Sequence, residues 1–151
     1  MEFPSTAPQF SLQGVHTGRV VSLHDGDTFT AIVKLGETFY KFSVRLSGID
    51  TCEMTSKDEV LKAKAFMARD RFFNLITNFK VDTLAWRKKD FDEYFQRNYT
   101  LVTMNCKEMD KYGRVLSDVN NFADILIGEK LAYEYNGGTK LTESEQKKLL
   151  S

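Results

Sequence analysis

Apolar and polar residues alternate along much of the chain between residues 15 and 49, a period of two that is typical of β-strands. We predict strands over residues 15–24, 28–34 and 39–49. Turn signals at Asp25-Gly26 and at Leu35-Gly36-Glu37 separate them. The three strands should therefore follow one another as a meander.

The apolar pattern changes to helical spacing over residues 57–76, which predicts a helix packed on the core. We interpret the basic residues of this helix as its solvated face: Lys62, Lys64, Arg69 and Arg71. Residues 77–98 give a mixed signal, because 81–86 could form a short strand while 87–97 has aromatic residues at helical spacing. We interpret them as an insertion of undetermined shape, whose aromatic residues form a local core in preference to a base-stacking surface.

The last third of the chain repeats both patterns. Strands are expected over residues 99–107 and 115–119, with a turn at 109–114 between them. Helices should follow over 121–130 and 142–150, and the second begins with a Thr-x-x-Glu capping box.

Five strands, one helix after the third strand and helices at the end predict an α+β fold, a five-stranded barrel of the oligonucleotide-binding (OB) type with three helices. An open sandwich is the weaker alternative, because so few strands would leave unprotected edges. Residues 1–13, which contain both prolines, are expected to form a flexible arm, and residues 14–151 a single domain.

Composition narrows the classes of function. The 21 basic residues balance the 21 acidic ones, so any site for a polyanion must be local. Two cysteines make no disulfide framework, and no Cys/His spacing suggests zinc. No apolar run is long enough to span a membrane, and no secretory signal is visible. We therefore expect an intracellular protein, although a processed secreted form would look the same. We also expect a monomer.

The stretch whose residues point most clearly to a chemical function is residues 44–53, which are predicted to form a strand that ends in a polar loop. Arg45, Asp50, Thr51 and Glu53 leave this strand end together. Phosphodiester hydrolysis needs such a set, because it uses oxygen ligands for a hard cation, a carboxylate for the water and a guanidinium for the phosphate. The competing interpretation, acids at a helix N-terminus, explains one acid but neither Arg45 nor Asp27.

Two further motifs are ambiguous alone. Residues 25–28, Asp-Gly-Asp-Thr, could be a simple hairpin turn, but Asp27 would then open a strand, where aspartate is disfavoured. Residues 110–114 could be a charged turn in which Gly113 takes a positive φ and Arg114 opens the next strand. No serine lies in a nucleophile elbow, so acyl transfer has no support.

Together these motifs resemble the staphylococcal nuclease (thermonuclease) family. The resemblance covers residues 20 to about 135 and rests on Asp-Gly-Asp-Thr at 25–28, Val-Arg-Leu-Ser-Gly-Ile-Asp-Thr-Cys-Glu at 44–53, Asp-Lys-Tyr-Gly-Arg at 110–114 and Lys-Leu-Ala at 130–132. It implies a five-stranded barrel with three helices and a Ca²⁺-dependent cleavage of DNA and RNA that leaves 3′-phosphates.

The resemblance also implies a role for each site residue. Asp27 and Asp50 would bind Ca²⁺ through their carboxylates and Thr51 through its backbone carbonyl. The other four roles belong to the reaction and the substrate: Glu53 as general base, Arg45 and Arg114 as phosphate-binding arginines, and Tyr112 as part of the nucleotide pocket.

The sequence departs from the family pattern at Cys52, where a proline is usual, and at residues 77–98, which are longer than the compact form. Two alternatives to a nuclease stay open: an OB-fold module that binds nucleic acid or a protein partner without catalysis, and an interaction domain that uses the insertion. A module without catalysis should have lost some of the acids or arginines, and this chain keeps them.

Overall fold

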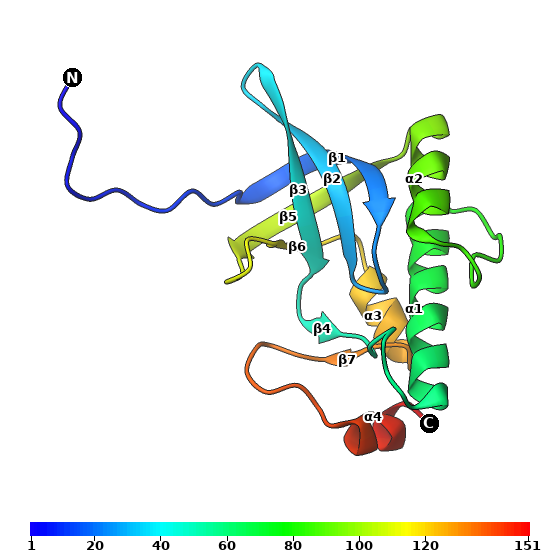
Figure 1. Ribbon diagram of the computed structural model, residues 1–151. Helices are drawn as coiled ribbons and strands as arrows, with labels where there is room; N and C mark the ends of the chain where they lie inside the picture. Colours follow the sequence, from blue (N-terminus) through cyan, green and yellow to red (C-terminus); the bar gives the residue numbers. More distant parts are fainter.

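The computed structural model describes all 151 residues and shows a closed barrel of five strands in the order β1-β2-β3-β6-β5, accompanied by four helices (Figure 1). Neighbouring strands are antiparallel except β3 and β6, which are parallel. The predicted α+β barrel is thereby confirmed. Its strands are β1 (Gly14–Leu23), β2 (Thr28–Leu35), β3 (Thr38–Leu46), β5 (Leu101–Met109) and β6 (Val115–Asp118).

The period-two pattern places one side of each strand in the barrel core. In β2, for example, Phe29, Ala31 and Val33 are all buried. Helix α1 (Glu59–Thr77) packs against this core, with the Phe72 ring edge-on to the Phe29 ring at a centroid distance of 5.8 Å. The carboxylate of Asp58 caps α1 by accepting hydrogen bonds from backbone N–H groups of its first turn.

The third strand is shorter than predicted, because β3 ends at Leu46. Gly48 then takes a φ of +82°, a left-handed conformation that interrupts the strand. The chain resumes as the short strand β4 (Ile49–Asp50), which pairs outside the barrel with β7 (Tyr133–Glu134). This small sheet was not predicted from the sequence. It turns Asp50, at the acidic end of the 44–53 stretch, away from the line of β3.

The insertion forms a fourth helix, α2 (Lys88–Arg97), so the prediction of three helices is wrong, and residues 81–86 form no strand. Its aromatic side chains surround Phe73 of α1, with ring centroids 5.3 Å from Trp86 and 4.9 Å from Tyr94. The interpretation of these residues as a local core is confirmed.

Arg69 does not belong to a solvated face, contrary to the sequence analysis. Its side chain is buried, and Nη2 donates to the backbone oxygen of Trp86 at 2.7 Å. Burial lowers the pKa of the Arg69 guanidinium. The residue ties α1 to the insertion, a role that helical spacing alone does not reveal.

The C-terminal part holds helices α3 (Phe122–Gly128) and α4 (Glu143–Leu150). The capping box of α4 is confirmed, since Thr142 and Glu145 exchange both side-chain to backbone hydrogen bonds. Helix α3 ends two residues earlier than predicted, and Lys130 beyond it takes a φ of +59°.

Residues 1–13 have no regular secondary structure and extend from the barrel in Figure 1. Near the end of this stretch, Leu12 is buried and the Phe10 ring stacks on the Phe42 ring at 6.5 Å. None of the helices combines the length and the apolar character needed to cross a membrane.

Candidate active site

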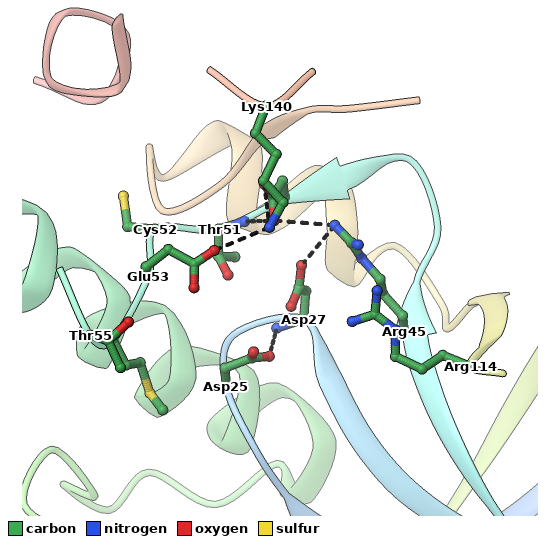
Figure 2. A pocket seen from close by; sticks show the side chains of 11 residues that line it. Asp25, Asp27, Arg45, Thr51, Cys52, Glu53, Thr55, Arg114 and Lys140 are labelled. Atoms are coloured by element: carbon green, nitrogen blue, oxygen red, sulfur yellow. Dashed lines mark hydrogen bonds and ion pairs between the residues drawn. The ribbon is translucent and has the colours of Figure 1, made fainter. Parts of the chain in front are cut away.

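A cavity of about 220 Å³ opens where the β1–β2 loop, the end of β3 and strand β4 meet (Figure 2). It is mostly polar, because only two of its 11 lining residues are hydrophobic. Four separate segments of the chain contribute to it: residues 25–27, residues 45–55, Arg114 and Lys140. Six of the seven predicted site residues line the cavity: Asp27, Arg45, Asp50, Thr51, Glu53 and Arg114.

Close packing positions the β1–β2 loop. A Cβ atom added at Gly26 would lie 2.6 Å from Cβ of Ala68 in α1, so a larger residue cannot fit without a shift. Gly26 does not have a positive φ, so its requirement is the close approach rather than the hairpin geometry that the sequence predicted. Oδ1 of Asp25 accepts a hydrogen bond from the backbone N–H of Asp27 at 3.1 Å and completes the loop.

Asp27 is buried, and only one of its carboxylate oxygens has a hydrogen-bond donor. Oδ1 accepts from the hydroxyl of Thr28 at 3.2 Å. Oδ2 has no donor and lies 3.6 Å from Nη2 of Arg45. Burial, aided by the charge of Asp25, raises the pKa of Asp27 well above its ordinary value. A buried carboxylate oxygen without a donor is costly, and either a proton or a bound cation relieves that cost.

Arg45 connects the two buried acids of the cavity. Its Nη2 donates to Oδ1 of Asp50 at 3.1 Å and to the backbone oxygen of Ile49 at 3.2 Å. Since the same nitrogen is the one beside Asp27, a single guanidinium group partly neutralises both carboxylates. The Arg45 guanidinium also lies over the Tyr135 ring, 5.5 Å from its centroid.

Asp50 is oriented by neighbours on both of its oxygens. Oδ1 accepts from the backbone N–H of Thr51 at 3.0 Å, and Oδ2 accepts from the hydroxyl of Tyr133 at 2.7 Å. Burial, together with this hydrogen bond, raises the pKa of Tyr133, so its hydroxyl stays a donor. No pattern in the sequence points to Tyr133, because only the pairing of β4 with β7 brings it to Asp50.

Glu53 lies at the open side of the cavity, with its side chain 62% exposed. Its Oε1 accepts a hydrogen bond from Nζ of Lys140 at 3.1 Å, and the same Nζ lies 3.4 Å from Oδ2 of Asp50. Burial lowers the pKa of Lys140, but the neighbouring acids Asp50 and Glu53 outweigh it and raise the pKa overall. Lys140 follows Glu53 by 87 positions and belongs to no motif, so no pattern in the sequence points to it.

Arg114 reaches the cavity from a turn that Asp110 organises. Oδ2 of Asp110 accepts from Nε of Arg114 at 2.7 Å, and its Oδ1 accepts from the backbone N–H groups of Tyr112 and Arg114, each at 2.9 Å. Burial raises the pKa of Asp110, but these hydrogen bonds outweigh it and lower the pKa overall. Gly113 has a φ of +82°, which confirms the positive φ predicted there.

Tyr112 is the predicted site residue that does not line the cavity. Its side chain is exposed, and its ring lies 5.5 Å from Cζ of Arg114. It borders a second cavity of about 630 Å³, to which Arg45 and Arg114 also contribute. The two arginines therefore separate the acidic cavity from a larger one that contains Tyr112 and Tyr135.

Cys52 occupies the position where a proline was expected. Its side chain is buried against Leu61, Ala65 and Tyr133 in a small second core. Burial raises the pKa of the thiol to about 11, so it is protonated at neutral pH. The residue thus packs the loop that carries Glu53 against α1.

No group of three or more His, Cys, Asp and Glu side chains has the arrangement of a metal site. Asp27 and Asp50 are nevertheless suitable for a hard cation, because both are buried carboxylates on one cavity and Oδ2 of Asp27 has no donor. The donor set consists of oxygens, which Ca²⁺ and Mg²⁺ prefer. These residues therefore fit the divalent cation that the sequence motifs imply.

Comparison of the chain with models of known protein families gave no match. A search of curated proteins likewise gave no significant match.

Proposed function

We propose that this protein is a Ca²⁺-dependent phosphodiesterase that hydrolyses DNA and RNA, with an OB-type barrel of the staphylococcal nuclease kind. The observation that carries the proposal is the convergence of Asp27, Arg45, Asp50, Glu53 and Arg114 on one cavity. A buried pair of acids beside two arginines and an exposed acid suits the hydrolysis of a phosphate diester. The five-stranded order with one parallel pair supports the OB type.

Asp27 and Asp50, with the backbone carbonyl of Thr51, are the residues that would hold the cation. Both carboxylates are buried, and Arg45 offsets part of their negative charge. A divalent cation would be enough to balance the negative charge that remains. When bound, the cation would draw charge from a phosphate oxygen and orient the phosphate.

Glu53 is the residue that would act on water. Its exposed carboxylate reaches the solvent side of the cavity, where it can accept a proton from the attacking water. Arg45 and Arg114 would stabilise the phosphate oxygens, whose negative charge increases in the transition state. The bond between phosphorus and the 5′ oxygen would then break, the leaving oxygen would take a proton from solvent, and the product would carry a 3′-phosphate.

Little sequence preference is expected, because contacts with the phosphodiester backbone carry no base information. The second cavity adjoins the two arginines and offers Tyr112 for contact with the nucleotide. The net charge of the chain is zero, so attraction of the substrate depends on the local cations and should weaken as salt increases.

The direct test is cleavage of single-stranded DNA and RNA with Ca²⁺ and with a chelator, followed by analysis of the product ends. We expect Ca²⁺-dependent cleavage and 3′-phosphate ends. Glu53→Gln should reduce kcat by about 10²- to 10⁴-fold. Glu134→Gln, which removes another exposed acid outside the cavity, is the matched control and should cleave normally.

Two results would contradict the proposal in different ways. Binding of nucleic acid without cleavage under any divalent cation would favour the OB-fold module without catalysis. Full activity of a folded Glu53→Gln variant would remove Glu53 from the reaction, while the assignment as a nuclease could stand.

A further inference from the structure

Lys140 is the least constrained cation of the acidic cavity. Its Nζ contacts Glu53 Oε1 at 3.1 Å and Asp50 Oδ2 at 3.4 Å, whereas Arg45 also binds a backbone carbonyl and Arg114 is held by Asp110 (Figure 2). The Lys140 ammonium therefore lies between the acid proposed to hold the cation and the acid proposed to act on water.

The backbone of Lys140 is anchored on both sides while its side chain remains free to move. Before it, the hydroxyl of Tyr135 donates to the backbone oxygen of Gly138 at 2.6 Å. After it, Thr142 caps helix α4. The Lys140 side chain itself is 46% exposed and has four rotatable bonds in its stem, so the ammonium can leave the acids without any change in the fold.

Stability does not account for this arrangement. Ion pairs between partly exposed side chains contribute little to folding, because solvent screens them and two long side chains lose freedom. The Lys140–Glu53 pair is of this kind, since both side chains are about half exposed or more. The Lys140 ammonium lies beside the buried Asp50 carboxylate, so its main effect is expected to be on the binding of a cation by Asp50.

We propose that Lys140 is an exchangeable counter-ion that occupies the carboxylates of Asp50 and Glu53 until a divalent cation displaces it. This inference rests on the divalent cation of the proposed function. A divalent cation held by the Asp50 carboxylate would repel an ammonium that lies 3.4 Å from Oδ2 of that carboxylate, so the ammonium is expected to leave. Displacement frees Glu53 for water and leaves the ammonium at the mouth of the cavity, where it can meet a substrate phosphate.

The test is the affinity of the apo protein for Ca²⁺ by isothermal titration calorimetry, with terbium luminescence as a second readout. Lys140→Gln should bind the cation about two- to fivefold more tightly, which is the range that an exposed ion pair is worth. Lys140→Arg keeps the charge and should bind like the wild type. In cleavage assays, Lys140→Gln should also raise KM for the nucleic acid.

Lys57→Gln is the matched control. Lys57 is exposed and borders a groove that also contains Glu53, but it forms no ion pair. This control measures the general effect of removing one positive charge near the cavity. Only the increase in Ca²⁺ affinity of Lys140→Gln beyond that of Lys57→Gln is assigned to the contact of Lys140 with Asp50 and Glu53.

Equal Ca²⁺ affinities of folded Lys140→Gln and Lys57→Gln would overturn the inference, and so would weaker binding by Lys140→Gln, which would make Lys140 a support for the acids. If the wild type binds Ca²⁺ but cuts no nucleic acid, the nuclease proposal fails while the affinity comparison still decides the role of Lys140. If the wild type binds no divalent cation, both proposals fall.

Discussion

The hydroxyl of Tyr133 donates a hydrogen bond of 2.7 Å to Oδ2 of Asp50, and the two residues face each other across the pairing of β4 with β7. Both residues are buried. This contact fixes the orientation of a carboxylate that lies between Arg45 and Lys140. Hydrogen-bonding partners behind a metal ligand commonly determine how well it binds.

Tyr133→Phe should therefore weaken divalent-cation binding by about 10- to 100-fold, because Asp50 loses the donor that orients it. Titration calorimetry with Ca²⁺ measures this directly. Tyr40→Phe is the control, since Tyr40 is exposed on β3 and does not line the cavity. Equal affinities of the two variants would show that Tyr133 does not tune Asp50.

Asp110→Asn should release Arg114 and lower kcat/KM for nucleic acid by up to about 10²-fold, the loss expected when one charge-stabilising donor is removed. The neutral amide cannot form the ion pair that now holds Arg114 Nε. Asp118→Asn, which breaks the exposed ion pair with Lys107, is the control and should change little. Unchanged kinetics in a folded Asp110→Asn variant would mean that Arg114 needs no such support.

The same contact predicts a pH dependence of stability. Because the pKa of Asp110 is lowered in the folded state, its stabilising contribution is complete above the ordinary aspartate pKa and is lost as pH falls through the lowered value. The difference in unfolding free energy between wild type and Asp110→Asn should be constant near neutral pH and shrink in acid. Urea denaturation over a pH series measures it, and a difference that grows in acid would contradict the sign.

Gly26→Ala should destabilise the fold by about 1–3 kcal/mol, as overpacking of a tight contact does. The added Cβ would meet the side chain and backbone of Ala68. Gly128→Ala is the control, because a Cβ there meets nothing within 4 Å and alanine suits the helix. Urea denaturation of both variants is the measurement, and equal stabilities would show that the β1–β2 loop can move away from α1 without penalty.

Arg69→Met should destabilise the protein by about 1–3 kcal/mol, because it leaves the backbone oxygen of Trp86 without its donor. Lys62→Met, at an exposed position of the same helix, should stay within about 0.5 kcal/mol of wild type. Thermal unfolding compares the two. If both variants melt alike, Arg69 does not fasten the insertion to α1.

Much of the fold could be predicted from local pattern. Alternation and turn residues located all five barrel strands, and the Thr142–Glu145 box located α4, because these signals depend on neighbours in sequence. The shape of the insertion was harder to predict, since the aromatic residues of α2 pack against Phe73 of α1, which is distant in sequence. The end of β3 at Leu46 was also missed, because the sheet that continues the chain is formed with a distant strand.

The sequence by itself determined which side chains could do chemistry, since acids and arginines in unfavourable strand-end positions stand out from local propensity. Only the tertiary structure decided which of them meet: it put Arg45 between Asp27 and Asp50, moved Tyr112 to the neighbouring cavity, and brought Tyr133 and Lys140 to acids more than 80 positions earlier. The reason is that long-range strand pairing, in the barrel and in the separate β4–β7 sheet, brings distant segments together, and no local period in the sequence encodes it.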